Sequence, residues 1–425
     1  MGDNLKSDFE HPLINQISAC HYHNKKHIRK IQRMKRVPAE TSLIEIVSTK
    51  RQKMRGLLPI SFSFFIKKIC KKVSIHDSKK IFLLTRDANF LEEPLKYQMA
   101  KDGLDLEVRI LHIDRTQSFF LNMKSPTDLK ANLFLFGDPA SSITLRNLIL
   151  AMKIPQPIID EHPEILPFLD IDVRYMVDGN VLKSFISKAI QHKNSSVTDY
   201  LHSMGVISSE NVCLVDIGYS GTTARELSIY LKREKITTGR IDCYYFASNK
   251  HLFSNALLTA PPVFLHEALI LPYSRPYKVA SDTFSWLEPY VLDNHYGPIE
   301  GYSANTVIRS YDEWAVPLYI QLEFLQKIIY HLDRNYDYRK ILLQLLKAVI
   351  VPNGGDVRFV KNLKHCKNYD NLSSESIIKD ATFWDFNKAY NELLSGDYWI
   401  GGSLKHSHMT LRLLMRIRRD WLQAR

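Results

Sequence analysis

The sequence contains little cysteine and no long apolar run. Its five cysteines are odd in number and none lies in a CxxC pair, so they predict neither a disulfide framework nor a zinc site, and a reducing compartment fits. No run of about 18 apolar residues is present, which is the length that crosses a bilayer. The first residues are polar and acidic, unlike a signal peptide. We expect a cytoplasmic protein or a peripheral one.

Acidic residues are fewer than basic ones. Lys and Arg total 57 against 45 Asp and Glu, a formal net charge of +12. Such an excess indicates an acidic partner, whether a phosphorylated ligand, an anionic lipid or a nucleic acid. Residues 23–36 hold seven Lys or Arg without stacking aromatics, so we expect no specific nucleic-acid binding. A solvated helix face is the alternative for this run.

Four segments have the apolar, β-rich character of buried parallel strands, and they follow an apolar, helix-like stretch at 55–72. The strands are expected at 81–85, 106–113, 212–215 and 241–247. This pattern predicts an α/β fold with a parallel sheet.

The remaining segments set the expected domains. Residues 1–54 form a basic, helical N-terminal segment, and 55–255 form the α/β core. Apolar residues at helical spacing predict a helical insertion at about 124–205. Residues 256–425 are expected to be loop-rich at first and then helical, as a C-terminal subdomain that binds an acceptor.

The stretch 211–230 has the pattern of a strand, a small-residue loop and a helix N-terminus. The strand ends on Asp216, and Gly218 and Gly221 allow a tight turn. Thr223 and Glu226 have the spacing of a capping box. The unpaired N–H groups of the first helical turn favour an anion, and phosphate is the natural guest. The alternative is an ordinary turn between a strand and a helix.

Charged residues also follow the two earlier strands. Arg86 and Asp87 come after the first, and Asp114 and Arg115 after the second. Open α/β sheets bind ligands at the carboxyl ends of their strands, and an Arg side chain offers two donors to phosphate oxygens. Surface salt bridges are the alternative.

The third strand and its loop resemble the 5-phosphoribosyl-1-pyrophosphate (PRPP) signature of type I phosphoribosyltransferases. In that family, acidic residues at a strand end hold the ribose hydroxyls and a Thr-Gly-x-Thr loop wraps the 5-phosphate. Here Asp216 matches the second acid, and Val215 stands in place of the first. The resemblance implies a phosphoribosyltransferase-like parallel sheet core.

A more specific resemblance covers about residues 50–305. The segments FLLTRDANFL and LVDIGYSGTTARELSIYL, with RGLLPISFSFFIKK, VRILHIDR, GRIDCYYFASN and WLEPYVLDNHYGPIEGY, are similar to a bacterial polysaccharide-biosynthesis family. It implies transfer of ribose 5-phosphate from PRPP to a growing O-antigen or capsule glycan. A separate phosphatase of the haloacid dehalogenase type then removes the phosphate. Ala88 replaces the family's Gly, and Tyr219 its Trp.

The resemblance implies a set of site residues. Asp216 would hold the ribose hydroxyls, and the phosphate loop would comprise Gly218, Ser220, Gly221, Thr222 and Thr223. Arg86 and Asp87 would lie on the side of the magnesium pyrophosphate, with Arg115 as a further phosphate contact. Asp87 is the first choice for the base, and Asp114, Glu288 and His295 remain candidates. Tyr219, Glu288 and His295 are the expected acceptor contacts, although the aromatic segment 286–302 also suits a core corner.

Two other classes share the donor loops. A nucleobase phosphoribosyltransferase would normally be half this length, and a non-catalytic PRPP-binding regulator would fit the incomplete acid pair. A phosphatase site within this chain is not expected, because Asp170-x-Asp172 is followed by Arg174 instead of a small residue.

The last segment, 404–425, has an apolar stripe beside many arginines. The stripe comprises Met409, Leu413, Leu414, Ile417 and Trp421. This composition is typical of an interfacial helix on an anionic membrane, here the inner face of the plasma membrane, where a lipid-linked glycan grows. A final helix docked on the protein core is the alternative.

Overall fold

The structure is a computed structural model that describes somewhat more than half of the chain. The described residues are 53–76, 78, 80–85, 88–113, 115–133, 143–175, 180–207, 211–218, 220–234, 240–248, 252, 255, 264–270, 287, 299–303, 306–309, 337–350, 352–360, 364–366 and 374–376. The basic run 23–36 and the terminal segment 404–425 lie outside them.

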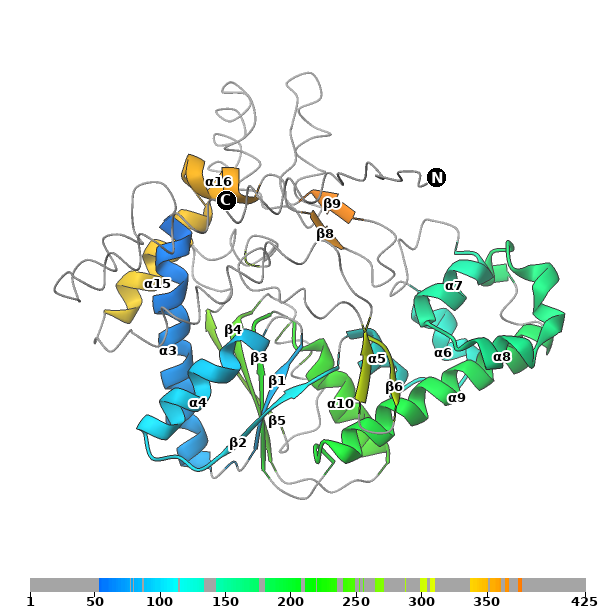
Figure 1. The fold of residues 1–425 in the computed structure, drawn as a ribbon, viewed down its shortest axis with the longest axis horizontal. Helices are drawn as coiled ribbons and strands as arrows, with labels where there is room; N and C mark the ends of the chain where they lie inside the picture. The colour runs from blue at the N-terminus through cyan, green and yellow to red at the C-terminus, as the bar shows by residue number, and fades with distance from the viewer. Residues whose placement is uncertain are drawn as a thin grey trace, which may run out of the picture.

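A five-stranded parallel sheet forms the centre of the fold (Figure 1), and its order is β2-β1-β3-β4-β5. The strands are β1 (Lys80–Leu84), β2 (Glu107–Leu111), β3 (Val212–Asp216), β4 (Ile241–Ala247) and β5 (Phe264–Ile270). The apolar runs of β1, β3 and β4 are almost wholly buried, because helices cover both faces of the sheet. The predicted α/β class with a parallel sheet is confirmed.

The sheet extends beyond residue 255, where the sequence predicts that the core ends. β5 pairs in parallel with β4, with Tyr245 opposite Ala268. The expected boundary at 255 and the loop-rich assignment of this stretch are therefore wrong for residues 264–270.

One face of the sheet is covered by α3 (Lys53–His76) and α4 (Glu92–Lys101), and α15 (Tyr338–Ile350) packs against α3 (Figure 1). The short 3-10 turn η1 (Asn89–Leu91) precedes α4, and α16 (Gly354–Val360) follows α15. Phe62 of α3 packs on Phe246 of β4, with ring centroids 4.2 Å apart. The apolar stretch at 55–72 therefore packs on the sheet, as its sequence predicts.

The opposite face carries α5 (Arg115–Phe120), α9 (Asn180–Ser203) and α10 (Thr222–Arg233). A hairpin of β6 (Ile299–Ser303) and β7 (Thr306–Arg309) lies against α9. Tyr302 stacks on Tyr200 at 4.6 Å and donates a hydrogen bond from Oη to His112 O at 2.7 Å. The hairpin is thereby tied to the end of β2.

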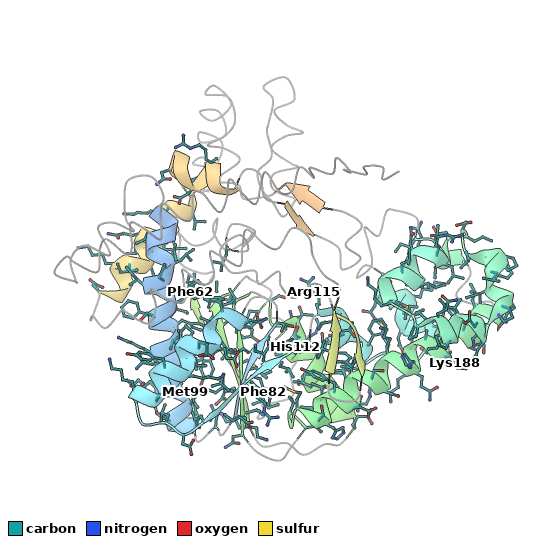
Figure 2. The ribbon with its side chains drawn as sticks, viewed as in Figure 1. Phe62, Phe82, Met99, His112, Arg115 and Lys188 are labelled. Carbon is teal, nitrogen blue, oxygen red and sulfur yellow. The ribbon has the colours of Figure 1, made fainter. Side chains whose placement is uncertain are left out.

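Helices fill the described chain between β2 and β3. They include α6 (Pro126–Ala131), α7 (Leu145–Met152), α8 (Gln156–Asp160) and the 3-10 turns η3 (Pro163–Phe168) and η4 (Val173–Tyr175). Their apolar side chains form a second cluster with the first half of α9, separate from the sheet clusters. Figure 2 shows this arm reaching away from the sheet, with Lys188 on α9. The predicted helical character of this region is confirmed for its described residues.

Two short strands, β8 (Lys364–Cys366) and β9 (Ser374–Ser376), pair with each other in antiparallel fashion.

Cys70, Cys213 and Cys243 are buried free thiols, and burial raises the pKa of Cys70 to about 12. Among the described helices, none combines the length and the apolar character that a membrane span requires.

Candidate functional site

The strand order creates a switch point between β1 and β3. From β1 the chain continues through α4 to β2 on one side, and from β3 it continues through α10 to β4 on the other. α4 and α10 cover opposite faces, so the two loops diverge from neighbouring strand ends. In open α/β sheets this divergence leaves a crevice at the carboxyl edge, where ligands bind.

Asp216 ends β3 at this edge. It lies opposite Tyr245 of β4, is partly exposed, and accepts a hydrogen bond on Oδ1 from the Gly218 N–H at 3.3 Å. The Ala247 N–H donates to Ile217 O at 3.2 Å and fixes the start of the loop against β4. Val215, in contrast, is fully buried in the sheet, so it cannot contact a ligand.

Gly221 begins α10 in a left-handed conformation. Its φ is +67°, and the first helical hydrogen bond runs from the Arg225 N–H to Gly221 O at 3.0 Å. The N–H groups of the helix's first turn have no acceptor within the helix and point toward the carboxyl edge. They give this edge the donors and the positive dipole end that favour an anion.

The capping box expected from Thr223 and Glu226 is not formed. The helix begins two residues earlier than that box requires, at Thr222, and its N-cap Gly221 has no side chain to accept a bond. Glu226 is instead buried and bound to Arg225 and to Asn122. These competing partners explain the failure of the prediction.

The two glycines of the loop differ. A Cβ on Gly221 would approach Leu252 Cδ1 to 2.7 Å and Tyr245 Oη to 3.1 Å. The space that a side chain would need at this position is therefore already occupied by other side chains. A Cβ on Gly218 would meet no atom within 4 Å, and the Gly218 φ lies outside the left-handed region. Gly218 is itself buried, but a small side chain at this position would have room.

The hydroxyl groups of the loop are held in place. Ser220 Oγ and Thr222 Oγ1 are 2.8 Å apart and share a hydrogen bond. Asn255 donates from Nδ2 to Ser220 O at 2.7 Å, and to Thr222 Oγ1 at 3.5 Å. Thr223 follows on the first turn and is partly exposed. Asn255 was not predicted as a site residue, because no pattern in its own segment indicates that it reaches this loop.

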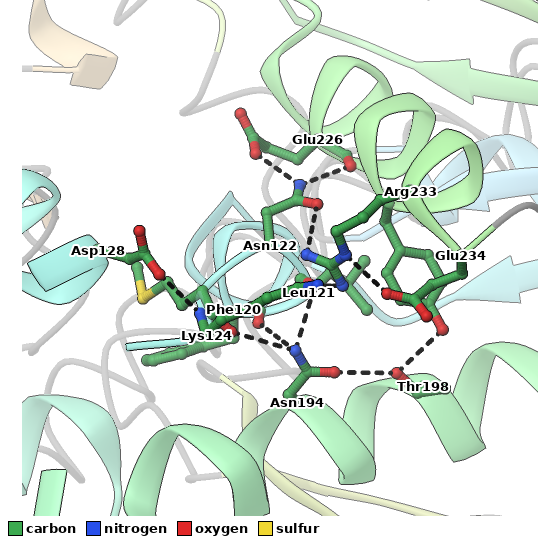
Figure 3. A network of polar contacts seen from close by, with 12 residues as sticks. Phe120, Leu121, Asn122, Lys124, Asp128, Asn194, Thr198, Glu226, Arg233 and Glu234 are labelled. Atoms are coloured by element: carbon green, nitrogen blue, oxygen red, sulfur yellow. Dashed lines mark hydrogen bonds and ion pairs between the residues drawn. The ribbon is translucent and has the colours of Figure 1, made fainter. Parts of the chain in front are cut away.

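A chain of polar contacts connects the loop to the helical arm. Arg225 donates to Asn255 Oδ1 at 2.8 Å and also pairs with Glu226. Asn122 donates from Nδ2 to Glu226 O at 2.7 Å and to Glu226 Oε2 at 2.8 Å. Arg233 then bonds Leu121 O at 2.7 Å (Figure 3). The start of α10 is therefore braced from Asn255 on one side and Asn122 on the other.

Arg115 is exposed at the start of α5, after the end of β2 (Figure 2). It is at the same edge as Asp216, but β1 lies between their two strands. The structure therefore does not bring Arg115 directly beside the loop. The other predicted residues Arg86, Asp87, Tyr219, Glu288 and His295, and the alternative base Asp114, lie outside the described residues.

The described residues contain no group of three or more His, Cys, Asp or Glu that could hold a metal ion. Asp216 supplies a partly exposed carboxylate at the carboxyl edge, and oxygen ligands are those that Mg²⁺ prefers. Asp87, the residue expected on the side of the magnesium pyrophosphate, lies outside the described residues.

The Asp-x-Asp pattern of the helical arm is occupied by ion pairs. Asp170 binds Arg146 at 3.0 Å, and Asp172 binds Arg174 through both carboxylate oxygens. The Arg146 hydrogen bond lowers the pKa of Asp170. Both carboxylates therefore serve structural contacts of the arm.

The chain matches no family model, and a search of curated proteins finds no significant match. The function is therefore inferred from the geometry of the carboxyl edge and from the sequence resemblance.

Proposed function

We propose that the protein is a PRPP-dependent phosphoribosyltransferase that transfers ribose 5-phosphate to a growing bacterial polysaccharide, an O-antigen or a capsule. The observation that carries the proposal is the loop between β3 and α10. It lies at the switch point of a parallel sheet, follows the carboxylate of Asp216, and ends at a helix N-terminus beside Ser220 and Thr222. A ligand with both a phosphate and sugar hydroxyls matches this combination.

Each end of the loop suits one end of ribose 5-phosphate. The first N–H groups of α10 and the hydroxyls of Ser220, Thr222 and Thr223 are donors for the 5-phosphate. Asp216 can only accept hydrogen bonds when it is ionised, so the ribose hydroxyls are its natural partners. Arg86, Asp87 and Arg115 are proposed for the pyrophosphate side.

The reaction is a displacement at the ribose C1. The bond from C1 to the pyrophosphate oxygen breaks as the acceptor hydroxyl oxygen bonds to C1, and the hydroxyl proton passes to a base. Asp87 is the first candidate for the base. From the α donor, direct displacement gives a β-ribofuranosyl 5-phosphate. When bound, Mg²⁺ supplies charge neutralisation on the departing pyrophosphate.

The acceptor and the later steps follow from the same proposal. Tyr219, Glu288 and His295 are proposed to contact the acceptor sugar. A separate phosphatase of the haloacid dehalogenase type would remove the 5-phosphate to leave ribofuranose. Because such glycans grow on a lipid carrier, we propose that the enzyme works in the cytoplasm, held peripherally on the inner face of the plasma membrane through residues 404–425.

Calorimetric titration with PRPP and magnesium tests the loop. Gly218→Val adds a branched side chain next to Asp216, at a position where an added Cβ meets no atom within 4 Å, so we expect a folded protein whose affinity for PRPP falls about 10-fold or more. Leu150→Ala, at an exposed position of the helical arm, is the control and should bind as the wild type does. If folded Gly218→Val and the wild type bind PRPP with equal affinity, the loop is not part of the PRPP site.

A further inference from the structure

Among the described residues, two polar side chains at the end of β1 have buried atoms without hydrogen-bond partners. Asn89 is 5% exposed, and within the described part of the chain neither its Nδ2 nor its Oδ1 has a hydrogen-bond partner. The Oγ1 atom of Thr85 is also buried and unpaired there. An unsatisfied buried polar group costs about 1–3 kcal/mol of desolvation, so such groups call for an explanation. Three such atoms within five residues, at the carboxyl end of one strand, are the observation from which a ligand contact is inferred.

These atoms lie at the carboxyl end of β1, the strand that neighbours β3 in the sheet. The Ala88 N–H donates to Leu84 O at 3.2 Å, so the chain turns back over the end of β1 and places Asn89 there. Ala88 and Phe90, its two neighbours, are buried in the same apolar cluster as Ile217 of the β3 loop. Thr85 and Asn89 thus lie on the β1 side of the switch point.

The chemistry of the three atoms selects the ligand. A phosphate offers only acceptors, so it would satisfy Nδ2 and leave Oδ1 facing an anion. A hydroxyl both donates and accepts, so neighbouring hydroxyls can satisfy the amide and the Thr85 hydroxyl together. Both side chains are neutral, which suits an uncharged part of a ligand whose phosphate binds elsewhere.

We propose that Thr85 and Asn89 form a subsite for sugar hydroxyls, which lies beside the phosphate loop. This inference rests on the proposed function and deepens it. Asp216 accepts from hydroxyls on the β3 side, and Asn89 adds a donor and an acceptor on the β1 side. The hydroxyls belong either to the ribose of PRPP or to the acceptor sugar, and the two sources give different results in the test.

Asn89→Leu is the informative variant, because leucine has nearly the same shape and no polar atoms. Removing a buried amide that lacks partners should keep or raise the melting temperature. If the hydroxyls are those of the ribose, the affinity for ribose 5-phosphate should fall about 10-fold or more, whereas the affinity for inorganic phosphate should not change. Thr85→Val removes the hydroxyl at constant shape and should act in the same direction.

Asn194→Leu is the matched control. Its Nδ2 donates to the carbonyls of Phe120, Leu121 and Met123 at 3.1, 3.2 and 3.3 Å, so its loss should lower the melting temperature. Ribose 5-phosphate binding by the folded control should match the wild type. A purely structural Asn89 would behave as Asn194 does, with lower stability and unchanged binding.

Calorimetry with ribose 5-phosphate and with phosphate, together with the KM for the glycan acceptor, separates the outcomes. Weaker ribose 5-phosphate binding by Asn89→Leu assigns the subsite to the donor. Unchanged donor binding with a raised acceptor KM assigns it to the acceptor sugar. If both stay unchanged while the wild type binds PRPP, the subsite is refuted and the proposed function stands. If the wild type binds neither PRPP nor ribose 5-phosphate, the proposed function fails and the subsite with it.

Discussion

At the scale of single residues, the two loop glycines have different tasks. Gly221 needs a positive φ and close contact with Leu252 and Tyr245, whereas Gly218 needs neither. We expect Gly221→Ala to lower the free energy of unfolding by about 1–2 kcal/mol, and Gly218→Ala to change it by less than about 0.5 kcal/mol. Urea denaturation of both variants checks this, and equal losses would contradict the assignment.

A second residue-scale prediction concerns Asp87, which lies outside the described residues. If Asp87 is the base, Asp87→Asn should retain PRPP binding and lower turnover by about 100-fold or more, the scale of lost general-base catalysis. Steady-state rates and calorimetry on the same preparation measure both effects. Near-normal transfer would move the base to Asp114, Glu288 or His295.

Local patterns in the sequence were sufficient to predict that Asp216 ends a strand and that a small-residue loop leads from it into a helix. The reason is that the strand, the turn and the helix lie next to each other in the chain. Local patterns failed for the capping box, because Glu226 is held by Asn122, 104 residues away. They also missed Asn255, 35 residues beyond Ser220. Contacts of this kind are fixed by tertiary packing and leave no local pattern.

At the scale of elements, Asn255 is predicted to position the loop for its ligand. It bonds the Ser220 carbonyl and the Arg225 side chain, so it holds the loop against the start of α10. Asn255→Leu should weaken PRPP binding about 10-fold. Asn132→Leu, which removes a bond to Asp128 O within α6, is the control and should leave PRPP binding unchanged. Equal affinities of both variants would exclude a positioning role for Asn255.

The ion pairs of Lys68 and Lys72 in α3 with Glu267 in β5 predict how stability depends on pH. Burial alone would raise the pKa of Glu267, but the Lys72 hydrogen bond and the charges of Lys68 and Lys72 outweigh it and lower the pKa. A lowered folded pKa gives stability that is present above the unfolded pKa and is lost as pH falls through the folded value. Glu267→Gln should therefore lower stability at neutral pH by about 1 kcal/mol or less, and by less still in acid. Thermal unfolding across pH checks this, and a difference that grows in acid would contradict it.

The same contact explains why β5 was not predicted. Glu267 and His266 interrupt its apolar run, and this interruption favours a loop when only the local sequence is considered. In the fold, Lys72 from a helix 195 residues earlier satisfies the Glu267 carboxylate. The strands β1 and β3, whose apolar runs are unbroken, and β4, whose run is interrupted only by Asp242 near its start, were predicted to within one residue at either end.

At the scale of the whole molecule, the net charge of +12 and the basic segment 404–425 predict attachment to anionic membranes. Each Lys or Arg near such a surface can add about 1 kcal/mol, and salt weakens the effect. The full chain should pellet with anionic vesicles at low salt, and a folded truncation that lacks 404–425 should pellet less. Equal pelleting of both proteins, or none by the full chain, would refute attachment through this segment.

The central claim, phosphoribosyl transfer to a glycan, is tested most directly by product analysis. The purified protein is incubated with PRPP, magnesium and either a lipid-linked glycan acceptor or free nucleobases, and the products are identified by mass spectrometry. The account predicts that PRPP is consumed only with the glycan, which gains one ribose 5-phosphate while pyrophosphate is released. Transfer to a nucleobase would identify a salvage enzyme, binding of PRPP without any transfer would indicate a regulator, and either result would contradict the account.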